Sequence, residues 1–237
     1  VWELGSGRAL ATLEGHTAMV SACAVTPDGR HVVSASADHT LKVWELVSGR
    51  ALATLEGHTA RVSACAVTPA GRHVVSASED HTLKVWELVR AARRGSRAGR
   101  WQYGKTLKVW RALATLEGHT DRVLACAVTP DGRHVVSASA DHTLKVWGLT
   151  SGRVLATLEG HTASVLACAV TPDGRHVVSA SEDHTLKVWK LASGRALATL
   201  EGHTSSVSAC TVTRDGRHVV SASEDQTLKV WKLANGR

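Results

Sequence analysis

Histidine, serine, aspartate and tryptophan recur in this sequence with a spacing that does not change. The first set is His16, Ser34, Asp38 and Trp44. A serine, a histidine and an aspartate are the groups of a hydrolase whose nucleophile is the serine hydroxyl. The same groups also suit a hydrogen-bond chain, because an indole N–H only donates, a hydroxyl and a neutral imidazole do both, and a carboxylate accepts.

The number of sets decides between these two interpretations. An enzyme needs one site, whereas the set occurs five times, and no Gly-x-Ser-x-Gly motif surrounds the serines. We therefore interpret the sets as structural tetrads and predict that the chain is not an enzyme and has no catalytic residues. The four further tetrads are His58, Ser76, Asp80 and Trp86; His119, Ser137, Asp141 and Trp147; His161, Ser179, Asp183 and Trp189; and His203, Ser221, Asp225 and Trp231.

The tetrads belong to an internal repeat. The motif Leu-Glu-Gly-His-Thr occurs five times, and its glycines (Gly15, Gly57, Gly118, Gly160 and Gly202) are 42, 61, 42 and 42 residues apart. A fixed period of this length is typical of a repeat architecture. Within the first unit, residues 20–25, 31–36, 41–46 and 51–55 are short apolar or alternating runs separated by turn residues, which predicts four strands in each unit.

These motifs resemble one known family. Gly-His, then Pro-Asp-Gly, then Ser-x-Asp before a strand that ends in Trp is similar to the WD-repeat family, and the resemblance covers nearly the whole chain except about residues 88–105. It implies an all-β fold, a β-propeller of four-stranded antiparallel blades, in which each tetrad is a buried hydrogen-bond chain. The sequence departs from the family pattern where Ala70 replaces the turn aspartate, where Arg214 replaces the turn proline, and where Asp does not follow Trp.

We predict a single domain over residues 1–237 with five intact blades. Because residues 9–14 repeat the fourth strand and the last unit lacks one, pairing of the two chain ends is expected to close the ring. The long step holds an Arg-rich insert, residues 88–111, in which Thr106–Trp110 repeats a third strand and indicates an eroded blade. A six-sector ring with a half blade is the alternative, and self-association is expected if the ring does not close.

The positive charge of the chain is concentrated in the insert. The net charge is +7, and residues 88–116 contain eight Arg and Lys residues and no acid, so the rest of the chain carries −1. The alternative function is therefore nucleic-acid or polyanion binding through residues 88–111, with Trp101 and Tyr103 available to stack on bases. A basic run is more often a solvated linker, so nucleic acid is not the expected partner.

Several classes of site and location are disfavoured by composition. The five cysteines, one in each repeat, lie in apolar runs without a CxxC motif, which indicates reduced, buried thiols and a cytoplasmic protein. No Cys-His spacing fits zinc, and no apolar run is long enough to cross a membrane. We predict no metal and no cofactor, and interpret the remaining histidines as turn residues.

Partner binding is expected where the near-identical repeats differ. In the family, the matching positions face the top surface of the propeller, where proteins or peptides dock. The resemblance thus implies a non-catalytic protein–protein interaction scaffold, the docking or sensor propeller of a larger signalling protein. The three variable positions are Met19, Arg61, Arg122, Ser164 and Ser206; Ser21, Ser63, Leu124, Leu166 and Ser208; and Ala37, Glu79, Ala140, Glu182 and Glu224.

Overall fold

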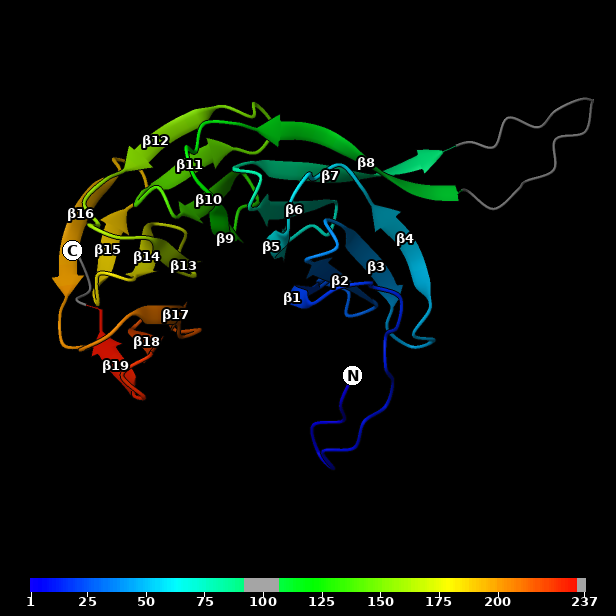
Figure 1. The fold of residues 1–237 in the computed structure, drawn as a ribbon, viewed down its shortest axis with the longest axis horizontal. Helices are drawn as coiled ribbons and strands as arrows, with labels where there is room; N and C mark the ends of the chain where they lie inside the picture. Colours follow the sequence, from blue (N-terminus) through cyan, green and yellow to red (C-terminus); the bar gives the residue numbers. More distant parts are fainter. Residues whose placement is uncertain (92–106, 234–237) are drawn as a thin grey trace, which may run out of the picture.

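The structure, a computed structural model, describes residues 1–91 and 107–233. Within these residues there are nineteen strands and no helix. The strands form four four-stranded sheets and one three-stranded sheet, all antiparallel and arranged as successive blades (Figure 1). The predicted all-β fold of four-stranded antiparallel blades is confirmed.

Each blade consists of strands that are consecutive in the sequence, with the first strand innermost. The first blade contains β1 (Val20–Val25), β2 (His31–Ser36), β3 (Leu41–Glu45) and β4 (Ala51–Leu55), and the second contains β5 (Val62–Val67), β6 (His73–Ser78), β7 (Leu83–Ala91) and β8 (Leu107–Leu116). The third contains β9 (Val123–Val128), β10 (His134–Ser139), β11 (Leu144–Gly148) and β12 (Val154–Leu158), and the fourth contains β13 (Val165–Val170), β14 (His176–Ser181), β15 (Leu186–Lys190) and β16 (Arg195–Leu200). The fifth has only β17 (Val207–Val212), β18 (His218–Ser223) and β19 (Leu228–Lys232).

Two kinds of turn join the first three strands of each blade. In the first blade, the amide of Gly29 donates to the Thr26 carbonyl at 2.8 Å, with Gly29 at a φ of 66° that only glycine adopts freely. The next turn places His39 at a φ of 68°, a conformation in which histidine is enriched among non-glycine residues. Four blades place a histidine at this turn position and the fifth places Gln226 there. The prediction that the remaining histidines are turn residues holds for these four but is wrong for the others, such as His31, which begin strands.

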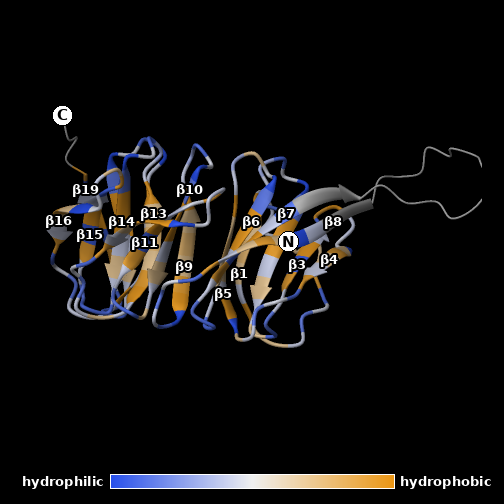
Figure 2. Ribbon diagram, turned by 90° about the horizontal axis from the view of Figure 1, so that it is seen from above, coloured by the Kyte–Doolittle hydropathy of each residue, from blue (hydrophilic) through white to orange (hydrophobic). Residues whose placement is uncertain are grey.

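The hydrophobic core lies between neighbouring blades. The first two blades share a cluster in which Val33, Leu41 and Val43 of the first blade meet Val62 and Trp86 of the second. Equivalent clusters join the other neighbours, and Figure 2 shows the apolar strands stacked between polar turns at both faces. Stacking buries an apolar face that a single blade would expose, which is why repeats of this kind are stable only together.

The blades form an open arc, so the predicted closure of the ring by residues 9–14 does not occur in this structure (Figure 1). The N-terminal segment pairs with itself, and β19 lies at the other end of the arc (Figure 1). Trp2 forms a bridge with Ala9, and the amide of Glu3 donates to the Arg8 carbonyl at 2.9 Å. This repeats the contacts between β3 and β4, so residues 1–3 already occupy the edge that β19 would need.

The ends of the insert extend one hairpin of the second blade. Residues Leu88–Ala91 continue β7 and pair with Leu107–Trp110, which form the first part of β8. The segment that the sequence indicated as the third strand of an eroded blade is therefore, from Leu107, part of a fourth strand. The remainder of the predicted insert, 92–106, lies outside the described residues.

Candidate functional site

Each predicted tetrad is assembled as a continuous hydrogen-bond chain. In the third blade, the indole Nε1–H of Trp147 donates to Ser137 Oγ at 2.8 Å, and His119 Nε2 lies 2.7 Å from the same oxygen. On its other side, His119 Nδ1 lies 2.7 Å from Asp141 Oδ2. A carboxylate can only accept, so the imidazole donates from Nδ1, and Nε2 accepts the serine hydroxyl. All five blades repeat this chain at 2.6–2.9 Å.

The aspartate of each tetrad also holds the turn that follows it. Asp80 Oδ2 accepts from the Thr59 amide at 3.1 Å, and Asp80 Oδ1 accepts from the amide and the hydroxyl of Thr82. Burial opposes the charge of Asp80, but hydrogen bonds from Thr82 and His58 outweigh it and lower the pKa of Asp80 to about 2. Burial likewise lowers the pKa of His58 against the opposing effect of Asp80. In the second blade the tetrad is thus a neutral imidazole beside an ionised carboxylate.

The tetrad reproduces the contacts of a serine hydrolase, but its hydroxyl is inaccessible. Ser76, Ser137 and Ser179 have no exposed surface, and the indole already donates to the oxygen that would attack a substrate. A nucleophile needs space for a carbonyl carbon beside it. The arrangement therefore serves to satisfy buried polar groups, which supports the structural interpretation.

The variable positions come together at one face, which we call the top face. In every blade the backbone carbonyl at the first variable position accepts a hydrogen bond from the backbone amide at the third. The amide of Glu79 donates to the Arg61 carbonyl at 2.9 Å, and the amide of Glu224 donates to the Ser206 carbonyl at 2.9 Å. The corresponding pairs in the first, third and fourth blades are Ala37 with Met19, Ala140 with Arg122, and Glu182 with Ser164.

The second variable position is the extra residue of a β-bulge. The register between β1 and β2 shifts between Val20 and Ala22, which leaves Ser21 unpaired in the ladder. The same shift occurs in each inner strand and falls on Ser63, Leu124, Leu166 and Ser208. Bulges redirect a side chain and are common beside binding sites. Here one of them links two blades, since Arg61 Nε donates to Ser21 Oγ at 2.9 Å.

Exposure differs among these positions. Met19 is 58% exposed, and Arg122, Glu182 and Glu224 are exposed as well. Ala140, which the sequence included, is 7% exposed and so contributes backbone rather than a side chain to the surface.

The described residues bear on two other kinds of site, a metal site and the Arg-rich insert. Across residues 1–91 and 107–233, no group of three or more His, Cys, Asp or Glu side chains could hold a metal ion. In the same part of the chain, no helix is long and apolar enough to cross a membrane. Arg111, a basic residue of the insert, forms an ion pair with Glu87 at 3.1 Å. The two aromatic residues expected to stack on bases, Trp101 and Tyr103, lie outside the described residues.

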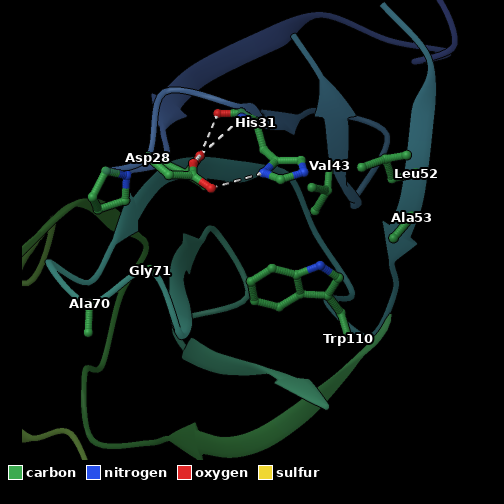
Figure 3. A pocket seen from close by; sticks show the side chains of 10 residues that line it. Asp28, His31, Val43, Leu52, Ala53, Ala70, Gly71 and Trp110 are labelled. Atoms are coloured by element: carbon green, nitrogen blue, oxygen red, sulfur yellow. Dashed lines mark hydrogen bonds and ion pairs between the residues drawn. The ribbon is translucent and has the colours of Figure 1, made fainter. Parts of the chain in front are cut away.

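One pocket was not predicted from the sequence. It has a volume of about 390 Å³ and lies between the first two blades, on the face opposite the top face, which we call the bottom face (Figure 3). Trp110 forms one wall, and Asp28 and His31 lie across from it. The departure at Ala70, which also lines the pocket, was the signal that could have indicated this position.

The sequence of the repeats matches a known family and parts of several known proteins. A family described as "WD domain, G-beta repeat" matches residues 7–45, 49–87, 110–148, 152–190 and 194–232. Nuclear distribution protein PAC1-2 of Uncinocarpus reesii is 30% identical over 156 residues, which are 64% of this chain and 34% of that protein. Anaphase-promoting complex subunit cdc20 of Dictyostelium discoideum is 51% identical over 47 residues, 20% of this chain and 9% of that protein.

A third relative is likewise matched over only part of its length. WD repeat-containing protein srw1 of Schizosaccharomyces pombe is 45% identical over 49 residues, 21% of this chain and 8% of that protein. The chain thus covers about a third or less of the length of these relatives. The similarity concerns the repeats themselves.

Proposed function

The chain belongs to the WD-repeat family, and from this we propose that it is a non-catalytic protein–protein interaction scaffold that binds a partner protein or peptide on the top face. In this proposal it is the docking or sensor propeller of a larger cytoplasmic signalling protein. The observation that carries the proposal is that three variable positions of otherwise near-identical repeats lie at one face, two of them joined by a backbone hydrogen bond in every blade. Differences that gather at one face are expected for a surface that carries specificity.

The charges on the top face divide it into two halves. In the second and third blades the arginines have acidic neighbours. Arg61 Nη1 lies 3.9 Å from Glu79 Oε1, and Arg122 Nε lies 3.8 Å from Asp121 Oδ1. In the fourth and fifth blades Glu182 and Glu224 are exposed, and serine stands at the paired variable position. We therefore expect basic side chains of the partner to meet the fourth and fifth blades, because complementary charges guide association and orientation.

A charge reversal on each face tests this proposal. The paired variant Glu182→Lys and Glu224→Lys changes the top face of the fourth and fifth blades. The matched control, Lys190→Glu and Lys232→Glu, changes two exposed residues on the bottom face of the same blades. In affinity capture from the cells that produce the protein, a specific partner should be lost with the first variant and retained with the second. Equal retention by both variants, or loss only with the control, would contradict the proposal.

A further inference from the structure

The pocket at the bottom face owes its shape to Trp110. At the other three junctions between blades, a leucine that follows the third strand packs against the shared core: Leu149, Leu191 and Leu233. At the first junction Trp110 packs against the described core. It comes from β8, and its indole forms a flat, half-buried wall of the pocket (Figure 3).

The other walls are apolar except at one side. Val43, Leu52 and Ala53 line the pocket from β3 and β4, and Ala70 replaces the aspartate that this turn has in the other blades. Asp28 supplies a carboxylate, and the described lining residues include no Lys or Arg. The related cleft between the third and fourth blades differs, because Arg175, Lys190 and Leu191 line it and no indole does.

Asp28 retains capacity for a ligand. Its Oδ1 accepts from the Thr26 hydroxyl at 2.6 Å and from the Arg30 amide at 3.0 Å. Its Oδ2 is 3.9 Å from His31 Nδ1, which is beyond hydrogen-bond distance, and the side chain is 54% exposed. The Thr26 and Arg30 hydrogen bonds lower the pKa of Asp28, so the carboxylate is ionised at neutral pH.

We propose that this pocket binds a basic side chain, an arginine of a partner polypeptide, with its guanidinium on the face of Trp110 and its N–H groups directed at Asp28. The face of an indole attracts cations. A guanidinium is planar and stacks on an aromatic ring while its in-plane N–H groups point sideways toward the free oxygen of Asp28, Oδ2, which the compact ammonium of lysine cannot do. The apolar walls formed by Leu52 and Ala53 accommodate the methylene arm of the side chain. The site is on the opposite face from the proposed docking surface and does not depend on it.

Single amino-acid ligands separate the elements of this proposal. N-acetyl-arginine amide is the probe, N-acetyl-citrulline amide is its uncharged isostere, and N-acetyl-norleucine amide is apolar only. Binding is followed by the NMR shift of the Trp110 indole N–H, assigned with Trp110→Leu. We expect saturable binding of the arginine probe with a Kd on the order of 1 mM, and at least ~10-fold weaker binding of the other two.

Variants then identify the residues. Asp28→Asn should weaken arginine binding ~10-fold, and Trp110→Leu should weaken it to a similar extent. Calorimetry measures the affinity of each variant for the arginine probe. Asp131→Asn is the matched control, because Asp131 holds the same turn in the third blade and lines the other cleft. It should leave binding unchanged. Equal affinity for arginine and citrulline, or an Asp28→Asn protein that binds as the unmodified chain does, would overturn the proposal.

Discussion

The imidazole of His119 and the carboxylate of Asp141 lie 2.7 Å apart in the third blade, with the histidine side chain fully buried and the aspartate side chain 7% exposed. Asp141 also accepts from the amide of Thr120 and from the amide and hydroxyl of Thr143. Removing this carboxylate leaves the buried Nδ1–H of His119 and the donors of the following turn without a partner.

Asp141→Ala should therefore lower the free energy of unfolding by about 2–4 kcal/mol, because each unsatisfied buried group costs roughly 1–3 kcal/mol. Urea denaturation measures this change. The control is Asp121→Ala, which removes a half-exposed aspartate from the same blade and should cost less than about 0.5 kcal/mol. Esterase activity should be absent before and after both substitutions, and hydrolysis that vanishes with Asp141→Ala would show that the tetrad is a catalytic site.

Acid should destabilise the protein in two stages. The pKa of His58 and of His161 is lowered by burial, so as the pH falls below the ordinary histidine value of 6.5 the unfolded chain binds protons that the folded chain does not. Asp80 and Asp183, whose pKa is about 2, give the same sign below pH 4. The melting temperature should thus be constant above about pH 7.5, fall below pH 6.5 and fall further below pH 4. A melting temperature that rises on acidification through pH 6 would contradict the neutral tetrad histidines.

Restoring the repeat at Ala70 should stabilise the second blade. In the third blade Asp131 accepts from the Thr129 hydroxyl and the Arg133 amide at 2.5 and 3.0 Å, whereas the Thr68 hydroxyl contacts only the His73 carbonyl and amide. Ala70→Asp should raise the free energy of unfolding by about 0.5–1.5 kcal/mol, and Asp131→Ala should lower it by a similar amount. Chemical denaturation of both variants tests the pair, and a loss at 131 without a gain at 70 would refute the equivalence of the two turns.

The repeat made the fold and the tetrads predictable, because spacing in the sequence became register in the sheets. His16 and Asp38 are 22 residues apart, as are His203 and Asp225, and each pair closes across one hairpin. The top-face positions were predictable for the same reason, since variation within identical repeats marks where side chains are free to differ.

Features that depend on neighbours were not predictable. Leu107–Trp110 repeats the sequence of a third strand, but it pairs with Leu88–Ala91 and joins β8, so the Trp110 indole packs against the core between the first two blades. The predicted closure is absent from the structure, in which Ala9 pairs with Trp2 and β19 has no fourth strand beside it. In both cases the local sequence is compatible with two partners, and only the assembled blades decide between them.

The open arc should be visible in thiol reactivity. The thiols of Cys65, Cys126, Cys168 and Cys210 each face a valine carbonyl of the preceding blade, at 3.6–3.9 Å, and burial raises the pKa of Cys210 to about 12. Cys23 has no preceding blade and is exposed. A thiol reagent should modify one cysteine at least ~10-fold faster than the rest, and Cys23→Ser should abolish the fast phase.

Light scattering on the same sample completes this measurement. A monomer with a fast phase agrees with the open arc. A monomer that lacks the fast phase would show that the chain closes on itself, and an oligomer that lacks it would show that copies associate through their ends.

Position-specific cross-linking tests the proposed binding of a partner to the top face. A photo-reactive amino acid is placed at Glu182 on the top face or at Lys190 on the bottom face of the same blade, both exposed. Irradiation in cells should give a discrete protein adduct from position 182 and none of the same mass from position 190. An identical adduct from both positions, or one from position 190 alone, would contradict it.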